Sequence, residues 1–399
     1  EDDPAQLPAS QLGPEGPRDR RGEAPFRQAH PVHVHVVALQ RDRDLSRGLE
    51  QAAQVVHELR DLPLKGDVGR PVRARGAQQV ELKLQEGPIQ DVADYVGDSL
   101  KLAQFATTVQ QPIILFCGVH FMAESADILT GEHQTVYMPE PKAGCPMANM
   151  ADIDQVRVAW EVLRAWGGTG WIPVVYVNST AEIKAFCGAN GGSTCTSGNA
   201  DKVMKWAFAQ GKRVFFLPDE HLGRNTAADL SIPAAQVVTF DPKKENGGLK
   251  RADVAGAQVV VWRGFCIIHT RFTPEHVRFA RKNWPDAKII VHPECPREVV
   301  RIVDAHGSTS RIIRFVEAAP AGSTVVVGTE VNLVERLARL HAGRVTVKAL
   351  APSVCRNMSM TSEKSLEELL RSWPEANVVS VPERIAADAR TALNRMLSL

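Results

Sequence analysis

The 399-residue sequence is poor in aromatic residues, at 6%, and no two of its seven cysteines form a Cys-x-x-Cys pair. Such pairs mark zinc ribbons and thioredoxin-like redox sites, so neither kind of site is indicated. The odd number of cysteines in so long a chain also argues against a disulfide framework. Any metal site must therefore be assembled from cysteines that lie far apart in the sequence.

The sequence also lacks an excess of one charge, a block of Lys and Arg, and an apolar run long enough to span a bilayer. Its formal net charge is +1, from 47 basic and 46 acidic residues. This balance predicts no nucleic-acid partner. The longest apolar runs, such as residues 113–116 and 259–262, have the length of buried strands. With no recognisable signal sequence, we expect no membrane association and a cytoplasmic location.

Residues 1–86 differ in composition from the rest of the chain. They contain no Ile, Asn, Thr, Met, Tyr, Trp or Cys, and a single Phe. This composition is typical of a poorly structured segment. Two interpretations remain open, a disordered extension and a mistranslated segment, such as a wrong reading frame, joined to a genuine protein. We expect no metal at His33 and His35, because their surroundings offer no rigid scaffold.

The remainder contains three copies of one pattern, in which short β-branched strands alternate with helices. Each copy has a hydroxyl-rich cluster near the start of a helix and a later strand that ends near a cysteine. These cysteines are Cys145, Cys266 and Cys355. The alternation predicts βαβ units, with parallel sheets covered by helices on both faces.

We therefore predict an α/β fold of three pseudo-threefold-related αβα sandwich lobes, with small parallel sheets around a central active site. Because of the chain length, several domains are expected. The predicted lobes are residues 87–170 (completed by the C-terminal residues 360–399), 171–285 and 286–359. Ligands of open α/β sheets bind beyond the carboxyl ends of the strands. The cysteines, the hydroxyl clusters and the polar strand ends should therefore meet in one cavity.

Three thiolates, one from each lobe, suit a soft metal and leave a coordination position open for substrate. The residues alone leave three interpretations open: a four-iron cluster with one iron acting as Lewis acid, a catalytic zinc ion, and three cysteines buried only for packing. The other four cysteines lack the threefold arrangement, and we expect them not to be ligands: Cys117, Cys187, Cys195 and Cys295.

Polar residues at two strand ends are the candidates for proton transfer. His292 and Glu294 form a general acid/base pair, and Tyr176 can donate a hydrogen bond. His269, three residues after Cys266, can either support a site residue from behind or be simply structural, and we favour the structural interpretation.

Hydroxyl groups near helix starts are the candidates for substrate binding, because hydroxyls and free backbone N–H groups bind carboxylate and phosphate there. Each one alone can be explained as an ordinary N-cap. Their occurrence at matching positions favours a small polyanionic substrate. They are Ser99, Ser197, Ser308 and Thr309.

Motifs from about Glu86 to the C-terminus resemble the quinolinate synthase family. They are residues 89–99, 121–124, 176–178, 218–224, 292–294, 307–310, 328–330 and 393–397. The resemblance implies three αβα lobes and one [4Fe-4S] cluster on Cys145, Cys266 and Cys355. It further implies the condensation of iminoaspartate with dihydroxyacetone phosphate to quinolinate in NAD biosynthesis, and a functional link to an aspartate-oxidising enzyme. The family's substrate contacts fall on Ser99, Tyr176, Asn178, Ser197, His292, Glu294 and Thr309.

One departure from the family pattern concerns the first lobe. Its first strand should end in a His-x-Tyr pair, where this chain has Leu82, Lys83 and Leu84. We expect no strand among residues 76–86, and a large loss of activity if the sequence is authentic. The alternatives to an active synthase are a catalytically impaired remnant that binds the cluster and a zinc-dependent hydrolase on the same cysteines.

Overall fold

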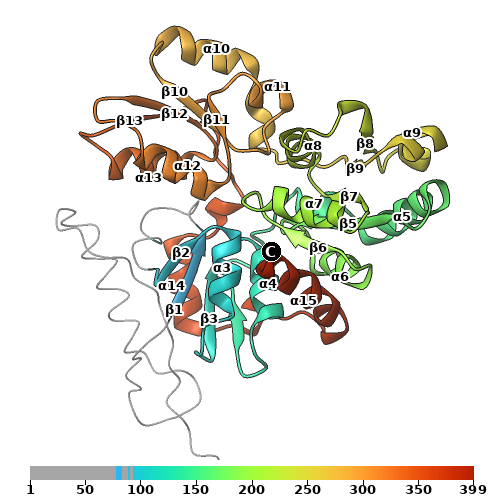
Figure 1. Cartoon of the computed structure of the whole chain (residues 1–399). Coiled ribbons are helices and arrows are strands. Elements are labelled where there is room, and N and C mark those ends of the chain that lie inside the picture. Colours follow the sequence, from blue (N-terminus) through green and yellow to red (C-terminus); the bar gives the residue numbers. More distant parts are fainter. Residues whose placement is uncertain (1–77, 83–88, 90–92) are drawn as a thin grey trace, which may run out of the picture. The chain divides into compact units, whose positions relative to one another are not determined.

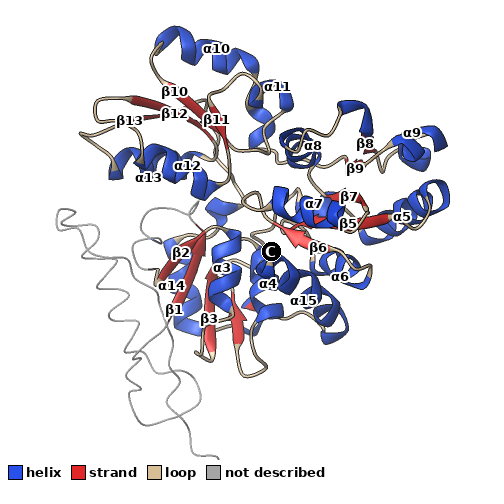
Figure 2. Ribbon diagram, in the orientation of Figure 1, coloured by secondary structure: helices blue, strands red, loops and turns tan. Residues whose placement is uncertain are grey.

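The computed structural model describes residues 78–82, 89 and 93–399. These residues belong to one compact unit that spans Val32–Leu399. They form three β-sheets flanked by helices (Figures 1 and 2). The predicted α/β class with small parallel sheets is confirmed. Most of the segment predicted to be poorly structured or mistranslated, residues 1–86, lies outside the described residues.

The first sheet has the strand order β14-β4-β3-β1-β2. Its strands are β1 (Gln78–Leu82), β2 (Tyr95–Gly97), β3 (Ile113–Cys117), β4 (Thr135–Tyr137) and β14 (Val378–Val379). Its helices are α3 (Ser99–Ala106), α4 (His120–Leu129) and α14 (Glu363–Ser372). All neighbouring strands are parallel except β14, which pairs antiparallel with β4.

The expectation of no strand among residues 76–86 is wrong. Strand β1 lies between β2 and β3 and pairs in parallel with both. Its sequence, Gln-Gln-Val-Glu-Leu, carries a weak local strand signal. The strand exists because neighbours on both sides satisfy its backbone groups, and those neighbours come later in the chain.

The second and third sheets are entirely parallel. The second has the order β6-β5-β7-β9-β8 and the third β11-β10-β12-β13. The strands of the second are β5 (Trp171–Tyr176), β6 (Ser193–Cys195), β7 (Arg213–Leu217), β8 (Val237–Phe240) and β9 (Val259–Trp262). Those of the third are β10 (Lys288–Val291), β11 (Ala305–His306), β12 (Thr324–Gly328) and β13 (Thr346–Ala349).

Helices connect these strands. Those of the second copy are α5 (Ile153–Gly167), α6 (Ala181–Ala189), α7 (Ala200–Ala209), α8 (Glu220–Asp229) and α9 (Arg251–Gly256). Those of the third are α10 (Pro274–Asn283), α11 (Arg297–Val300), α12 (Thr309–Glu317) and α13 (Val331–Leu340). Short 3-10 helices are η1 (Ala148–Met150), η2 (Ala234–Gln236), η3 (Glu245–Gly248), η4 (His269–Arg271), η5 (Met358–Met360) and η6 (Glu375–Asn377).

The three sheets share one topology. Four strands run in equivalent order in each: β2-β1-β3-β4, β6-β5-β7-β9 and β11-β10-β12-β13. Strands covered on both faces are expected to be apolar throughout, and all six residues of β5 are buried. The repeat that the sequence pattern indicates is therefore present in the strand connections.

The C-terminal residues divide between two sheets. Helix α14 and strand β14 pack with the first sheet, whereas α15 (Glu383–Ser398) packs against α6 and β6 of the second copy and against α4. Helix α15 lies so close to α6 that a Cβ at Gly188 would be 1.9 Å from the carbonyl oxygen of Asp388. Glycine therefore permits the contact between α6 and α15.

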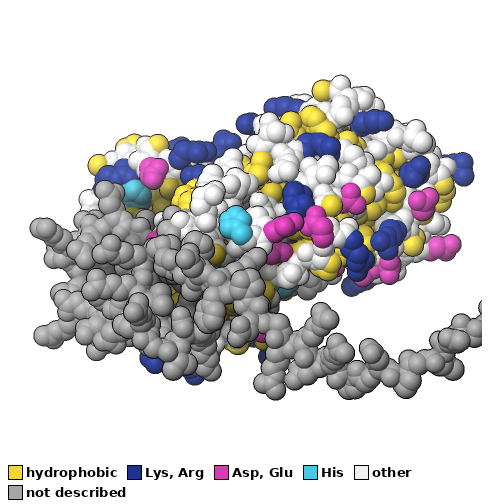
Figure 3. All heavy atoms as spheres, turned by 90° about the horizontal axis from the view of Figure 1, so that it is seen from below, with side chains coloured by type: hydrophobic (Ala, Val, Ile, Leu, Met, Phe, Trp, Pro, Cys, Tyr) yellow, Lys and Arg dark blue, Asp and Glu magenta, His cyan; other side chains and the backbone are white. Residues whose placement is uncertain are grey.

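Two surface expectations can be compared with the described residues. No helix in this part of the chain is both long and apolar enough to cross a bilayer. On the face shown in Figure 3, acidic and basic side chains are mixed with hydrophobic ones.

Candidate functional site

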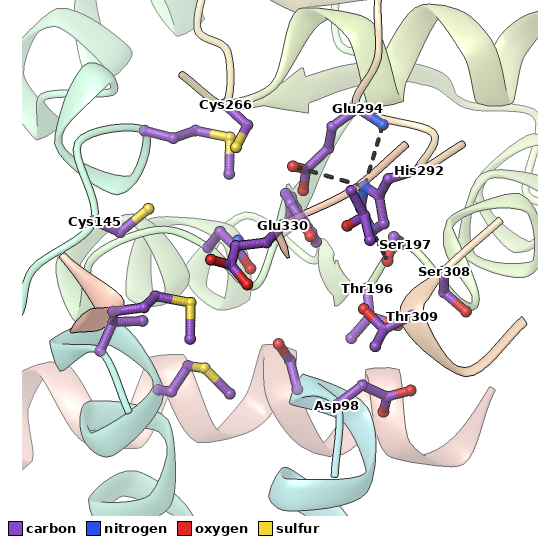
Figure 4. Close-up of a pocket in the computed structure, with 18 of the residues that line it drawn as sticks. Asp98, Cys145, Thr196, Ser197, Cys266, His292, Glu294, Ser308, Thr309 and Glu330 are labelled. Atoms are coloured by element: carbon purple, nitrogen blue, oxygen red, sulfur yellow. Dashed lines mark hydrogen bonds and ion pairs between the residues drawn. The ribbon is translucent and has the colours of Figure 1, made fainter. Parts of the chain in front are cut away.

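A cavity of about 300 Å³ is lined by residues from the loops of all three sheets (Figure 4). It contains every predicted site residue: Ser99, Cys145, Tyr176, Asn178, Ser197, Cys266, His292, Glu294, Ser308, Thr309 and Cys355. The four cysteines predicted not to be ligands are buried and do not line it. Figure 4 shows Cys145 and Cys266 on one side, with Thr196, Ser308 and Thr309 on the other.

The three cavity cysteines share one local geometry. Each follows the last core strand of its copy, β4, β9 or β13, and stands three residues before η1, η4 or η5. Its carbonyl oxygen accepts the N–H of the residue four positions later. Its sulfur accepts the N–H groups two and three positions later, which are Met147 and Ala148, Ile268 and His269, and Asn357 and Met358. Each turn therefore directs two backbone dipoles at a sulfur, which favours a thiolate.

Burial opposes the charge on these sulfurs. Desolvation raises the pKa of Cys145 to about 12 and raises the pKa of Cys266 and of Cys355 as well. A bound metal would therefore have to displace the thiol protons. Its positive charge would add the stabilisation of the thiolates that the backbone N–H groups alone do not provide.

The spacing of the sulfurs distinguishes between metal centres. Two thiolates on one tetrahedral zinc ion lie about 3.8 Å apart, because each Zn–S bond is about 2.3 Å long. Among the described residues, ligand atoms within 4.8 Å of one another occur in threes only at Cys266, His269 and Glu294. The three cysteine sulfurs therefore do not all lie within 4.8 Å of one another among the described residues, a wider arrangement than the sulfur spacing around one zinc ion. A four-iron cluster binds each cysteine through a different iron, so this donor set fits it.

Glu294 is the centre of a buried hydrogen-bond network. Its Oε2 atom lies 2.6 Å from Nδ1 of His269, and Tyr176 donates its phenol hydrogen to the same carboxylate. Nε2 of His269 lies 3.1 Å from Oγ1 of Thr329. Although burial raises the pKa of Glu294, the neighbouring His292 and His269 and these hydrogen bonds outweigh it and lower the pKa. Glu294 is therefore an ionised carboxylate at neutral pH.

His292 is held neutral beside this carboxylate. Burial lowers its pKa to about 3, although Glu294 opposes the shift. Its Nδ1 faces the backbone N–H of Glu294 at 3.4 Å, and its Nε2 lies 3.2 Å from Oγ of Ser197. This arrangement assigns the ring hydrogen to Nε2, from which it is donated to Ser197. The His292 ring stacks on His269 at a centroid distance of 4.3 Å.

Tyr176 occupies, in the second copy, the strand-end position that His292 occupies in the third. Burial and the nearby Glu294 raise its pKa well above the ordinary value, so its phenol stays protonated and can donate. Two residues later, Oδ1 of Asn178 is buried and has no hydrogen-bond partner among the described residues. A buried acceptor without a partner is costly unless a ligand donates to it.

The hydroxyl-rich side of the cavity lies at helix starts. Ser99 and Thr309 are the first residues of α3 and α12, rather than residues before them. Ser308 stands at the N-cap position of α12 but makes no side-chain cap bond. The hydroxyl group of Ser308 and the N–H groups of the first turn of α12 therefore remain available to an anion.

Sequence reasoning missed three polar groups of this region. His269, which we interpreted as structural, contacts Glu294 within the cavity wall. Asp219 and Glu330 each accept the backbone N–H of a cavity cysteine. Aligning the three copies on β3, β7 and β12 would have revealed Asp219 and Glu330, because each lies two residues after the end of its strand. For His269, which has no histidine counterpart in the other copies, no such signal exists.

The comparisons with known proteins identify the family of the chain. Residues 82–398 match the model of the family described as quinolinate synthetase A protein. The chain is 46% identical to the quinolinate synthase of Bacillus subtilis (strain 168) over 322 residues, which cover 79% of this chain and 87% of that protein. It is 47% identical over 320 residues, or 78% and 86%, to the quinolinate synthases of Bacillus anthracis (strain A0248) and Bacillus cereus (strain G9842). The matched region includes every residue that lines the cavity.

Proposed function

The chain belongs to the quinolinate synthase family, and we propose that it condenses iminoaspartate with dihydroxyacetone phosphate to quinolinate, with release of phosphate and water. The reaction would contribute to de novo NAD biosynthesis in the cytoplasm, and an aspartate-oxidising enzyme would supply iminoaspartate. The observation that carries this proposal is the meeting of three equivalent cysteine turns with an acid/base network in one cavity.

Cys145, Cys266 and Cys355 would hold a [4Fe-4S] cluster. The two backbone N–H groups at each sulfur support a thiolate, and three thiolates from three separate loops match the donors of such a cluster and leave one iron free. When bound, the cluster would supply a Lewis acid through the iron that no cysteine occupies.

Glu294, His292 and Tyr176 would move the protons of the condensation. Glu294 is ionised and can take a proton from a substrate carbon or nitrogen, with Tyr176 and His269 stabilising its charge beforehand. Neutral His292 carries its hydrogen on Nε2, where it can donate to a substrate oxygen after Ser197 moves aside or through Ser197. Tyr176 stays a donor throughout the neutral range.

The substrates carry carboxylate and phosphate groups, and the opposite side of the cavity suits them. Ser308 and Thr309 are the N-cap and the first residue of α12, where backbone N–H groups favour anions. Ser99 extends this side from α3, and Ser197 from the loop before α7. The unpartnered Oδ1 of Asn178 would accept a hydrogen bond from the imine or amine nitrogen of iminoaspartate.

Anaerobic purification of the full chain tests the proposal. We expect a brown protein with about four irons per chain that forms quinolinate from dihydroxyacetone phosphate and freshly generated iminoaspartate. The Cys195→Ala variant is the matched control, because Cys195 is buried outside the cavity lining. A colourless wild-type protein that takes up zinc and no iron sulfide would reject the proposal.

A second candidate function is that of a remnant that binds the cluster and turns over slowly. The observation that favours it is Leu82 and Leu84 in place of the family's His-x-Tyr pair. Lys83 and Leu84 lie outside the described residues. A brown, four-iron protein without measurable quinolinate formation would identify this alternative.

A further inference from the structure

Each cysteine loop is attached to the start of a helix by the same backbone hydrogen bond. The helices are α4, α8 and α13, which follow β3, β7 and β12, the strands at equivalent places in the three sheets. The first N–H of each helix donates to the carbonyl oxygen two residues before the cysteine. The bonds are His120 to Ala143 at 2.8 Å, Glu220 to Gly264 at 2.8 Å and Val331 to Ser353 at 3.2 Å.

The N-cap residue just before each helix breaks this equivalence. In the second copy it is Asp219, whose Oδ1 accepts the N–H of Leu222 at 2.6 Å and whose Oδ2 accepts the N–H of Cys266 at 3.2 Å. In the third copy it is Glu330, whose Oε2 accepts the N–H of Asn332 at 2.8 Å and whose Oε1 accepts the N–H of Cys355 at 3.3 Å.

The first copy has a different residue at this position. The N-cap of α4 is Val119, which makes no side-chain cap bond and has no atom able to accept the N–H of Cys145. All three N-cap residues are buried, with exposures of 4% for Val119, 0% for Asp219 and 2% for Glu330. The two carboxylate bridges are therefore shielded from water, where breaking one leaves an N–H group unsatisfied.

We propose that Asp219 and Glu330 are positioning residues that hold Cys266 and Cys355 in place for the cluster, and that Cys145 is its least restrained ligand. The inference rests on the proposed function, since it concerns the ligands of that cluster. A carboxyl group that accepts both a helix N–H and the N–H of the ligand residue ties the cysteine loop to the start of the helix. Groups that orient metal ligands in this way commonly change metal retention when they are replaced.

Cluster retention tests this proposal without relying on activity. The holoprotein is challenged anaerobically with excess EDTA, and the loss of the cluster's visible absorption is followed with time. We expect Asp219→Ala and Glu330→Ala each to lose the cluster about tenfold faster than wild type, which corresponds to one buried hydrogen bond. Asp219→Asn and Glu330→Gln should lose the cluster at rates between those of wild type and the alanine variants, because an amide has one accepting oxygen and keeps only one of the two N–H bonds that each carboxyl group accepts.

A matched control separates this role from helix capping. Asp152 is also an aspartate N-cap seven residues after a cavity cysteine, but its carboxylate accepts the N–H groups of Asp154 and Gln155 in its own helix, α5. Asp152→Ala should lower the melting temperature of the protein without accelerating cluster loss. Equal acceleration in Asp152→Ala and Asp219→Ala would overturn the proposal, because capping alone would then explain the effect.

The reverse substitution tests the same idea in the first copy. Val119→Asn places an acceptor at the position equivalent to Asp219, on an N-cap whose backbone is already extended. We expect it to slow cluster loss by about threefold or more. It also keeps the proposal testable should Asp219→Ala fail to fold.

The outcomes distinguish this inference from the proposed function. A wild-type protein that binds no iron–sulfur cluster overturns the proposed function and this inference with it. A cluster-loaded wild type whose loss rate is unchanged by Asp219→Ala, Glu330→Ala and Val119→Asn overturns this inference alone. The electron paramagnetic resonance spectrum of the reduced cluster should change in the two alanine variants and change less in the amide variants, which keep one accepting oxygen.

Discussion

The first copy of the repeat differs from the other two in what its loops bring to the cavity. The second and third copies each supply a cysteine, a carboxylate that bridges to it, and polar strand-end groups such as Tyr176 and Glu294. The first supplies Cys145 and Ser99, with Val119 where the others have a carboxylate. The shared cysteine turns explain how one metal centre can be held between three sheets. The differences between the copies make the cavity asymmetric, as the proposed condensation of two unlike substrates would require.

Removing one cysteine from any copy should have the largest effect. We expect Cys145→Ala, Cys266→Ala and Cys355→Ala each to lower quinolinate formation by about a thousandfold or more, because the Lewis acid is lost or displaced. Iron analysis and visible absorption of the anaerobically purified variants measure the cause directly. A variant that keeps four irons and full activity would show that its copy does not contribute a ligand.

Replacing the strand-end carboxylate of the third copy should have the next largest effect. Glu294→Gln should lower kcat by about 10²- to 10³-fold, because an ionised base becomes a neutral amide while the side-chain shape is kept. Steady-state kinetics of the iron-loaded variant measure the change. An unchanged kcat with an altered KM would indicate that Glu294 only binds substrate.

Giving the first copy the family's strand-end pair should raise activity. We expect the double variant Leu82→His and Leu84→Tyr to increase kcat/KM about 10- to 100-fold, because a donor and a proton carrier are added. The single variants serve as controls, and iron content should not change. If the double variant is no faster than wild type, the missing strand-end pair of the first copy does not limit the reaction. The difference between the copies would then have no effect on catalysis.

The contact between the first and second copies predicts a smaller effect, on stability. The Lys184 ammonium of α6 donates to the carbonyl oxygens of Phe121, in α4, at 3.3 Å and of Ser179 at 2.6 Å. Burial lowers its pKa to about 8, although Glu124 opposes the shift. Between about pH 8 and the ordinary lysine pKa, the unfolded chain therefore binds a proton that the folded chain has lost. Stability due to Lys184 should rise with pH in this window.

Urea unfolding of the metal-free protein at several pH values measures this slope. The free energy of unfolding of wild type, minus that of Lys184→Met, should increase by about 1 kcal/mol between pH 8 and pH 9 and stay flat below pH 7. Taking the difference between the two proteins cancels the titration of the buried cysteines. A flat or falling difference would show that Lys184 stays charged in the folded protein.

Much of the architecture could be predicted from the sequence, because its signals are local. The alternation of apolar strands with helices predicted the parallel sheets, and the threefold recurrence singled out Cys145, Cys266 and Cys355 before any contact was known. Strand β1 could not be predicted, since its sequence is weakly strand-like and its partners β2 and β3 lie elsewhere in the chain.

What the sequence by itself determined is the triplication, the type of sheet and which cysteines are equivalent, because each depends on residue patterns within a few turns or strands. Only the tertiary structure decided that His269 lies against Glu294, that Asp219 and Glu330 contact cysteine N–H groups, and that α15 packs on α6. These contacts join residues 25 or more positions apart in the chain, and they depend on packing and desolvation that no local pattern encodes.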